Sequence, residues 1–172
     1  MTEPTSHQRP DLADELLRRV AADQHARGVR ENGPDAECDH DLMRTVDADN
    51  VAALQRIIDE HGWPGHSLVG EQAANAAWLI AQHAELAFQL RALDLLDEAV
   101  AQGEATPVQR AYLLDRCLMR QGKPQLYGTQ YHDPGGGMRL WEVADPENLD
   151  RRRGEVDLGP HAEYDAAIRS RQ

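Results

Sequence analysis

Apolar side chains recur at helical spacing along most of this chain, and the longest such stretch runs from about Val69 to Ala101. Residues three, four and seven positions apart share one face of an α-helix, so this spacing predicts a helix that packs against its neighbours. Alanine dominates the first half of the stretch, and small side chains let neighbouring helices approach closely. Gly103 marks its end. The pattern predicts one long helix over residues 69–101.

Start and stop signals indicate the other helices. Thr106-Pro107-Val108-Gln109 is a capping box with proline at the first helical position, which is a strong signal for a helix start. Asp11 is a suitable N-cap for an early helix, and Gly62 is a suitable end for another. The predicted helices span residues 11–26, 47 or 49 to 61, 69–101, 107–121, a short segment after 145–146, and 160–170.

One region has the character of β-structure. Residues 125–132 contain residues typical of strands and alternate in polarity, and residues 138–143 form a second short run of this kind. The glycine-rich segment 133–137 between them is a turn signal, so the pair predicts a β-hairpin. We therefore expect a mainly α fold, a compact helical bundle with one small β-hairpin near the C-terminal third.

Length and composition bound the class of protein. The 172 residues fit one domain, and we expect a disordered leader over residues 1–10 and a single helical domain over residues 11–172. The first ten residues lack the apolar segment of a signal peptide, and no stretch approaches the ~20 apolar residues of a membrane span. Two distant cysteines, Cys38 and Cys117, make no disulfide framework. These features predict a cytoplasmic protein.

The charge of the chain restricts its partners. The formal net charge is −12, which argues against nucleic acid and anionic membranes because both need clustered positive charge. Lys123 is the only lysine and arginine supplies the other basic residues, a pattern that resembles the coding bias of a GC-rich bacterium. The expected partner is a small-molecule substrate, and the sequence leaves the oligomeric state open.

Two polar residues interrupt the apolar stripes. His83 and Asp115 each occupy a stripe position of a predicted helix, and burying a polar group without a partner costs roughly 2–7 kcal/mol. The simplest partner for each is the other. A carboxylate that is hydrogen-bonded to one imidazole nitrogen fixes the tautomer of the imidazole and makes its other nitrogen a better proton acceptor. The pattern favours an acid/base pair, and its alternative is a buried structural pair that joins two helices.

The neighbours of this pair are also polar. Gln82 precedes His83, and Arg116 follows Asp115, where a guanidinium is suited to hold an anionic group or to orient the carboxylate. Amide side chains recur every seven residues at Asn75, Gln82 and Gln89. This spacing indicates buried hydrogen bonds, either to backbone groups or to a ligand.

The predicted strand adds further candidates. Tyr127 is suited to act as an acid or hydrogen-bond donor, and Gly128 allows close approach of a backbone or ligand. The alternative is an edge strand whose polar groups satisfy its neighbours. The resulting candidates are His83, Asp115 and Tyr127 for catalysis, and Gln82, Arg116, Gln125, Thr129 and Gln130 for substrate binding.

Other kinds of site have weaker support. His61, His66 and His83 with nearby carboxylates are a possible metal site, but neither an HExxH motif nor a CxxC pair is present. Ser67 lacks the GxSxG context of a nucleophilic serine. The run Arg151–Arg153 is typical of a solvated helix face, with salt bridges to the acidic body as the alternative.

Four blocks of sequence resemble an uncharacterised bacterial domain family. They occur in order over about residues 47–165, and the family usually has Asp where this chain has Glu85. The resemblance implies a domain and a shared site, and it implies no activity. The residues of that shared site are Gln82, His83, Asp115, Arg116, Gln125, Tyr127, Thr129 and Gln130. The blocks are Trp63-Pro64 with Gly70 and residues 77–85 and 88–89, then 111–116, 125–130 and 150–153.

These observations lead to an expected function. The leading hypothesis is a small cofactor-independent enzyme, a hydrolase, lyase or cyclase in which His83, oriented by Asp115, acts as acid or base on a small polar substrate. Specialised metabolism is a fitting context for such an enzyme. The alternatives are a ligand-binding or partner-binding module with a structural polar core, and a metal-dependent enzyme.

Overall fold

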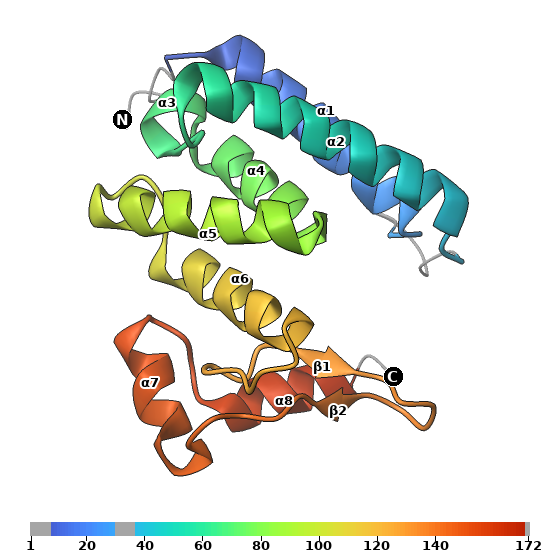
Figure 1. Ribbon diagram of the computed structural model, residues 1–172, viewed down its shortest axis with the longest axis vertical. Coiled ribbons are helices and arrows are strands. Elements are labelled where there is room, and N and C mark those ends of the chain that lie inside the picture. Colours follow the sequence, from blue (N-terminus) through green and yellow to red (C-terminus); the bar gives the residue numbers. More distant parts are fainter. Residues whose placement is uncertain (1–7, 30–36, 171–172) are drawn as a thin grey trace, which may run out of the picture. The chain divides into compact units, whose positions relative to one another are not determined.

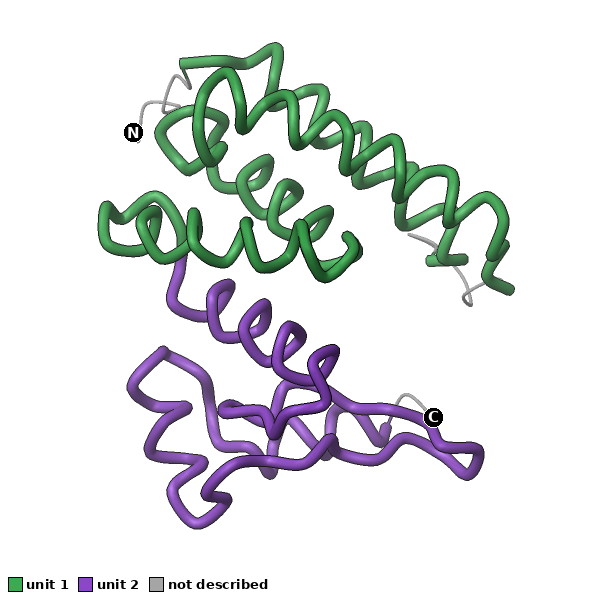
Figure 2. The backbone as a smooth tube through the Cα atoms, viewed as in Figure 1, with its two compact units in different colours: residues 1–105 green, residues 106–172 purple. Residues whose placement is uncertain are grey.

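A computed structural model describes residues 8–29 and 37–170 of the chain (Figure 1). It divides into two compact units, residues 1–105 and residues 106–172, which are described separately (Figure 2). Most of the expected leader, residues 1–7, lies outside the described residues, whereas Pro10 already begins a helix. Within the described ranges, no helix has the length and apolar character needed to cross a membrane.

The first unit is built from helices packed around α4. The helices α1 and α2 lie side by side, and each also packs against α4 (Figure 1). Leu16, Leu54, Ile57, Ile80 and Leu96 are fully buried in this unit. The helices are α1 (Pro10–Ala26), α2 (His40–His61), α3 (His66–Val69), α4 (Glu71–His83) and α5 (Leu86–Ala101).

The helix α2 begins earlier than the sequence predicts. Asp39 is its N-cap, and the carboxylate accepts hydrogen bonds from the backbone N–H groups of Asp41 and Leu42 at 3.1 and 3.0 Å. A capping carboxylate satisfies donors that the helix itself leaves unpaired. The predicted start at residue 47 or 49 is therefore wrong by about two turns.

The single helix expected over residues 69–101 is also wrong. Gly70 separates α3 from α4, and Ala84 and Glu85 adopt extended backbone conformations between α4 and α5. Alanine and glutamate are good helix formers, so the local sequence carries no signal for this second break. Because of the break, His83 is the last residue of α4.

The second unit begins with the helix that the capping box predicts. Thr106 Oγ1 accepts from the backbone N–H of Gln109, and the Gln109 side chain accepts from the backbone N–H of Thr106. This start is confirmed. The elements of the unit are α6 (Pro107–Arg120), β1 (Tyr131–His132), β2 (Arg139–Leu140), a 3₁₀ turn η1 (Pro146–Asn148), α7 (Leu149–Glu155) and α8 (His161–Arg169).

The hairpin is present but shorter than expected. The strands β1 and β2 pair antiparallel, with Tyr131 opposite Leu140. Residues 126–130 form no strand, and Gln125 makes only an isolated bridge to Val143. The mainly helical fold with a small hairpin in the C-terminal third is confirmed, whereas the strand assignment for residues 125–130 is wrong.

Two arginines of the run on α7 donate hydrogen bonds to loop carbonyl oxygens within the second unit. Arg153 is 2% exposed and donates to the carbonyl oxygens of Tyr127 and Gly159, both at 2.6 Å. Arg152 donates to the carbonyl oxygens of Leu126 and Ala144. Only Arg151 matches the expected solvated face. A planar guanidinium with several donors suits this role, because it satisfies loop carbonyls that have no strand partner.

Candidate functional site

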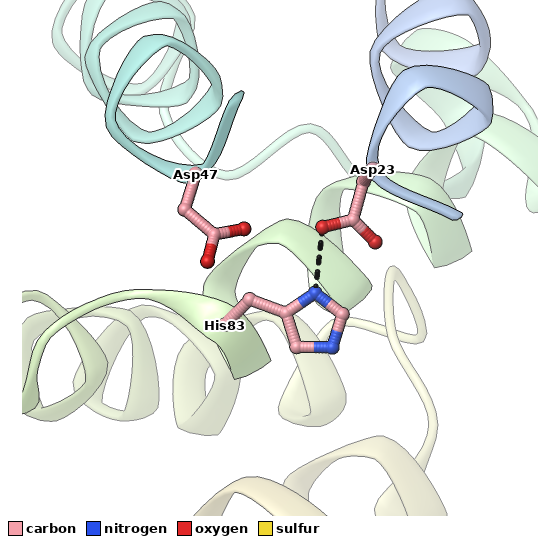
Figure 3. Close-up of side chains that lie close together, drawn as sticks. All are labelled: Asp23, Asp47 and His83. Atoms are coloured by element: carbon pink, nitrogen blue, oxygen red, sulfur yellow. Dashed lines mark hydrogen bonds and ion pairs between the residues drawn. The ribbon is translucent and has the colours of Figure 1, made fainter. Parts of the chain in front are cut away.

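The His83 side chain has a buried carboxylate as its partner. His83 Nδ1 lies 2.9 Å from Oδ1 of Asp23, which comes from the last turns of α1 and is 1% exposed (Figure 3). This bond stands in place of the expected bond between His83 and Asp115. The prediction that His83 is paired with a carboxylate is confirmed, and the identity assigned to that carboxylate is wrong.

Arg27 joins the same cluster. Its Nε lies 3.1 Å from Asp23 Oδ1 and 3.1 Å from His83 Nδ1, and its Nη2 lies 2.6 Å from Oδ1 of Asp47 on α2. A single guanidinium therefore contacts all three of the other side chains. The cluster draws its residues from α1, α2, α4 and the turn that follows α1.

The charges of the cluster follow from these contacts. Burial disfavours ionisation of Asp23, but the hydrogen bond from His83 and the charge of Arg27 hold the pKa of Asp23 below its ordinary value. Burial raises the pKa of Asp47, and the charge of Arg27 opposes that shift. At neutral pH the Asp23 carboxylate is charged and accepts from both His83 and Arg27.

This arrangement selects one tautomer of His83. Nδ1 cannot donate to Asp23 and accept from Arg27 Nε–H at once, because a neutral imidazole carries one proton. The ionised Asp23 oxygen can accept both bonds, so the stable arrangement places the His83 proton on Nδ1 and leaves a lone pair on Nε2. In Figure 3 the Nε2 edge of the ring faces away from both carboxylates.

A cavity of about 630 Å³ borders the cluster within the first unit. His83 and Asp47 line it, and Val51 and Phe88 contribute to an apolar wall. Arg44 and Glu85 add a positive and a negative charge to its lining. A cavity of this size with apolar walls and a few polar groups is typical of a site for a small molecule.

Sequence reasoning missed Asp23 and Arg27, although a signal for Asp23 was present. Asp23 follows Leu16 by seven residues, and Leu12 lies one turn earlier on the same buried face of α1. It is therefore a polar residue on an apolar stripe, like His83. Arg27 lies beyond the end of the helix, and its role becomes visible only when α1, α2 and α4 are packed.

Asp115 occupies a separate arrangement in the second unit. Its carboxylate is fully buried and accepts from the backbone N–H groups of Leu126, Tyr127 and Thr129 at 2.7 to 3.1 Å, and from the Thr129 hydroxyl at 2.9 Å. Burial raises the pKa of Asp115, and these hydrogen bonds oppose the shift. The carboxylate holds residues 126–129 in the loop that replaces the expected strand.

The polar side chains of that loop bond to one another. Gln125 Nε2 donates to the carbonyl oxygens of Gln130 and Trp141, and Gln125 Oε1 accepts from the backbone N–H of Gln130. Gln130 Nε2 donates to Thr129 Oγ1 at 3.0 Å. Gln125, Thr129 and Gln130 are all at least 96% buried. The structure thus brings these predicted residues together around Asp115, and their substrate contacts stay a prediction.

The remaining candidates are distributed between the units. Gln82 is buried on α4 beside His83, and its carbonyl oxygen accepts from Gln89 Nε2 at 2.8 Å. This bond confirms backbone hydrogen bonding for part of the predicted amide series, whereas Asn75 is exposed. Arg116 on α6 and Tyr127 in the loop are half-buried.

The donors for a metal ion differ from the expected set. Among the described residues, Asp23, Asp47 and His83 each offer a ligand atom, and these atoms lie within 4.8 Å of one another. His61 instead contacts Arg9 and Glu60, so of the three histidines considered only His83 belongs to this set.

Comparison with known proteins places the chain in one family. The model of a family of unknown function (DUF6624) matches residues 10–170, a longer region than the blocks at residues 47–165 indicate. No curated protein and no solved structure matches the chain.

Proposed function

The chain belongs to this family of unknown function, and we propose that it is a small enzyme that needs no cofactor and uses His83 as its acid/base group. Asp23 takes the orienting role that the sequence assigned to Asp115. The substrate is a small polar molecule, and the reaction is of the hydrolase, lyase or cyclase type. Specialised metabolism in a bacterial cytoplasm is the proposed setting.

One observation carries this proposal. The bond between His83 Nδ1 and the ionised Asp23 leaves Nε2 as the proton acceptor, and His83 lines a cavity of about 630 Å³. A positioned histidine of this kind contributes roughly 10²–10⁴-fold to a rate. A carboxylate that orients the imidazole and stabilises its protonated form is a recurrent partner in such sites.

The lining of the cavity supports a substrate-binding role for Arg44. The Arg44 side chain is 73% exposed and pairs with Asp41, which is 89% exposed, and such surface pairs contribute only about 0–1 kcal/mol. Arg44 is thus free to bind an anionic group of the substrate, beside the apolar wall formed by Val51 and Phe88. Roles for Tyr127 as an acid, and for Gln82, Arg116, Gln125, Thr129 and Gln130 as substrate ligands, remain predictions from the sequence.

A binding module is the second candidate. The observation in its favour is that Arg27 and His83 together satisfy the buried charge of Asp23, as a purely structural cluster would. A metal-dependent enzyme is the third candidate, supported by the donor set Asp23, Asp47 and His83. Elemental analysis of the purified protein tests this third candidate.

The proposed activity is tested by screening metabolites from the pathway that the neighbouring genes encode. The full-length protein is incubated with each compound, binding is measured by saturation-transfer NMR, and conversion is measured by mass spectrometry. We expect one compound that binds both the wild type and His83→Ala but is converted only by the wild type. A His61→Ala variant is the matched control and should convert it normally. Binding without conversion by the wild type would favour the module instead.

A further inference from the structure

The donors of the His83 cluster are arranged around a positive charge. Asp23, Asp47 and His83 come from α1, α2 and α4, and their ligand atoms lie within 4.8 Å of one another (Figure 3). Arg27 supplies that charge, since its guanidinium is 3.1 Å from Asp23 and His83 and 2.6 Å from Asp47. Two carboxylates and an imidazole around one cation are also the ligand types that Zn²⁺ accepts.

The present spacing of the three ligand atoms fits a metal only after a small rearrangement. Tetrahedral Zn²⁺ with bonds of about 2.1 Å requires ligand atoms about 3.4 Å apart. His83 Nδ1 and Asp23 Oδ1 are 2.9 Å apart and have to separate by about 0.5 Å, whereas Asp47 has to move toward them. A guanidinium is larger than a metal ion, and its departure removes the group that separates Asp47 from the other two.

We propose that a zinc ion binds to Asp23, Asp47 and His83 by displacing Arg27, and that it inhibits the enzyme by changing the tautomer of His83. This inference rests on the proposed function, because it assigns a regulatory ligand to the same site. Without metal, the His83 proton is on Nδ1 and the Nε2 lone pair is the base. Zinc bonds to the Nδ1 lone pair, so the single proton of the neutral ring passes through solvent to Nε2. Nε2–H cannot accept a proton from substrate.

Zinc titration of the full-length protein tests the ligand set. Isothermal calorimetry with zinc chloride should show one equivalent bound, and His83→Ala and Asp47→Asn should each weaken binding at least tenfold. Arg27→Met should tighten binding at least tenfold because it removes the competing cation. Arg19→Met is its matched control, because Arg19 lies on α1 and, like Arg27, pairs with two carboxylates, which are Glu15 and Asp49. Unchanged affinity in both Arg27→Met and His83→Ala would overturn the site.

A competing thiol site must be separated from this one. Cys38 Sγ lies 3.9 Å from His40 Nδ1 and 3.7 Å from Met43 Sδ, a set of atoms that is also suited to soft metals. The double variant Cys38→Ser, His40→Ala should keep the stoichiometric zinc site. Loss of that site in the double variant, with retention in His83→Ala, would contradict the proposal.

Nitrogen NMR of the wild type tests the tautomer change and does not depend on any variant folding. Long-range ¹H–¹⁵N spectra should show His83 protonated at Nδ1 without zinc and at Nε2 with one equivalent of zinc. Zinc binding without a change of tautomer would overturn the inhibitory mechanism. These readouts need no substrate, so they remain decisive if the enzyme proposal fails. Conversely, a purified protein that requires bound zinc for turnover would contradict inhibition while supporting a metal-dependent enzyme.

Discussion

His83 and Asp23 are separated by 60 positions in the sequence, yet Nδ1 of one lies 2.9 Å from Oδ1 of the other. Asp23→Ala removes the buried acceptor shared by His83 and Arg27 and leaves these two half-buried donors without it. We expect a loss of about 3 kcal/mol in the free energy of unfolding, measured with urea. Asp49→Ala removes a surface pair with Arg19, in which the Asp49 side chain is 76% exposed, and should cost less than about 1 kcal/mol. Equal losses in the two variants would contradict a special role for Asp23.

Asp115→Ala should destabilise the second unit. The backbone N–H groups of Leu126, Tyr127 and Thr129 would lose their common acceptor, and each unsatisfied buried donor costs about 1–3 kcal/mol. We expect a loss of at least about 3 kcal/mol in urea unfolding. Thr129→Val removes only the hydroxyl bonds and should cost about 1 kcal/mol. A milder effect for Asp115→Ala than for Thr129→Val would show that the loop does not depend on the carboxylate.

Gly128→Ala should be poorly tolerated. Gly128 has a φ of +66°, and a Cβ there would approach His161 Cδ2 to 2.8 Å. The positive φ and the contact together predict a loss of about 2 kcal/mol, measured as a shift in the urea midpoint. The control is Gly154→Ala in α7, where nothing lies within 4 Å of the added carbon. This change should be neutral or stabilise by about 0.5–1 kcal/mol, because alanine favours helix more than glycine does.

Glu15 makes stability depend on acid pH. It accepts from Arg56 and Arg19, and although burial opposes ionisation, these bonds hold the pKa of Glu15 below its ordinary value of 4.5. The unfolded chain therefore binds this proton at higher pH than the folded protein does. The stabilisation is complete above pH 4.5 and is lost as pH falls through the lowered pKa. Urea unfolding between pH 7 and pH 3 should show the wild type more stable than Glu15→Gln at pH 7, with the difference vanishing at the acid end.

Short-range signals predicted part of the fold well. The capping box at Thr106 and Gln109 acts within three residues, so the start of α6 could be placed from sequence alone. The break at Ala84 and Glu85 could not, because both residues favour helix and Ala84 is buried in an extended conformation. Residues 125–130 alternate like a strand, but the carboxylate of Asp115 satisfies the backbone donors that a strand partner would otherwise take.

The candidate site could also be predicted only in part from the sequence. The rule that a polar residue on an apolar stripe needs a partner located both His83 and Asp115, and each is indeed satisfied by hydrogen bonds. It could not identify those partners, because they depend on which helices pack together and on the path of a loop. Asp23 carried the same signal on α1, and including it would have left two carboxylates to choose between for His83.

The side chains of the His83 cluster come from different helices, so their hydrogen bonds form only when these helices pack together. A loosely packed state that keeps its helices, but in which α1 no longer packs against α4, contains no contact between Asp23 and His83. The tautomer of His83 is then no longer fixed. During gradual denaturation, the NMR signature of this histidine should therefore disappear with side-chain packing, while the far-ultraviolet circular dichroism of the helices persists. The NMR signal of the His83 imidazole thus reports whether α1 is packed against α4.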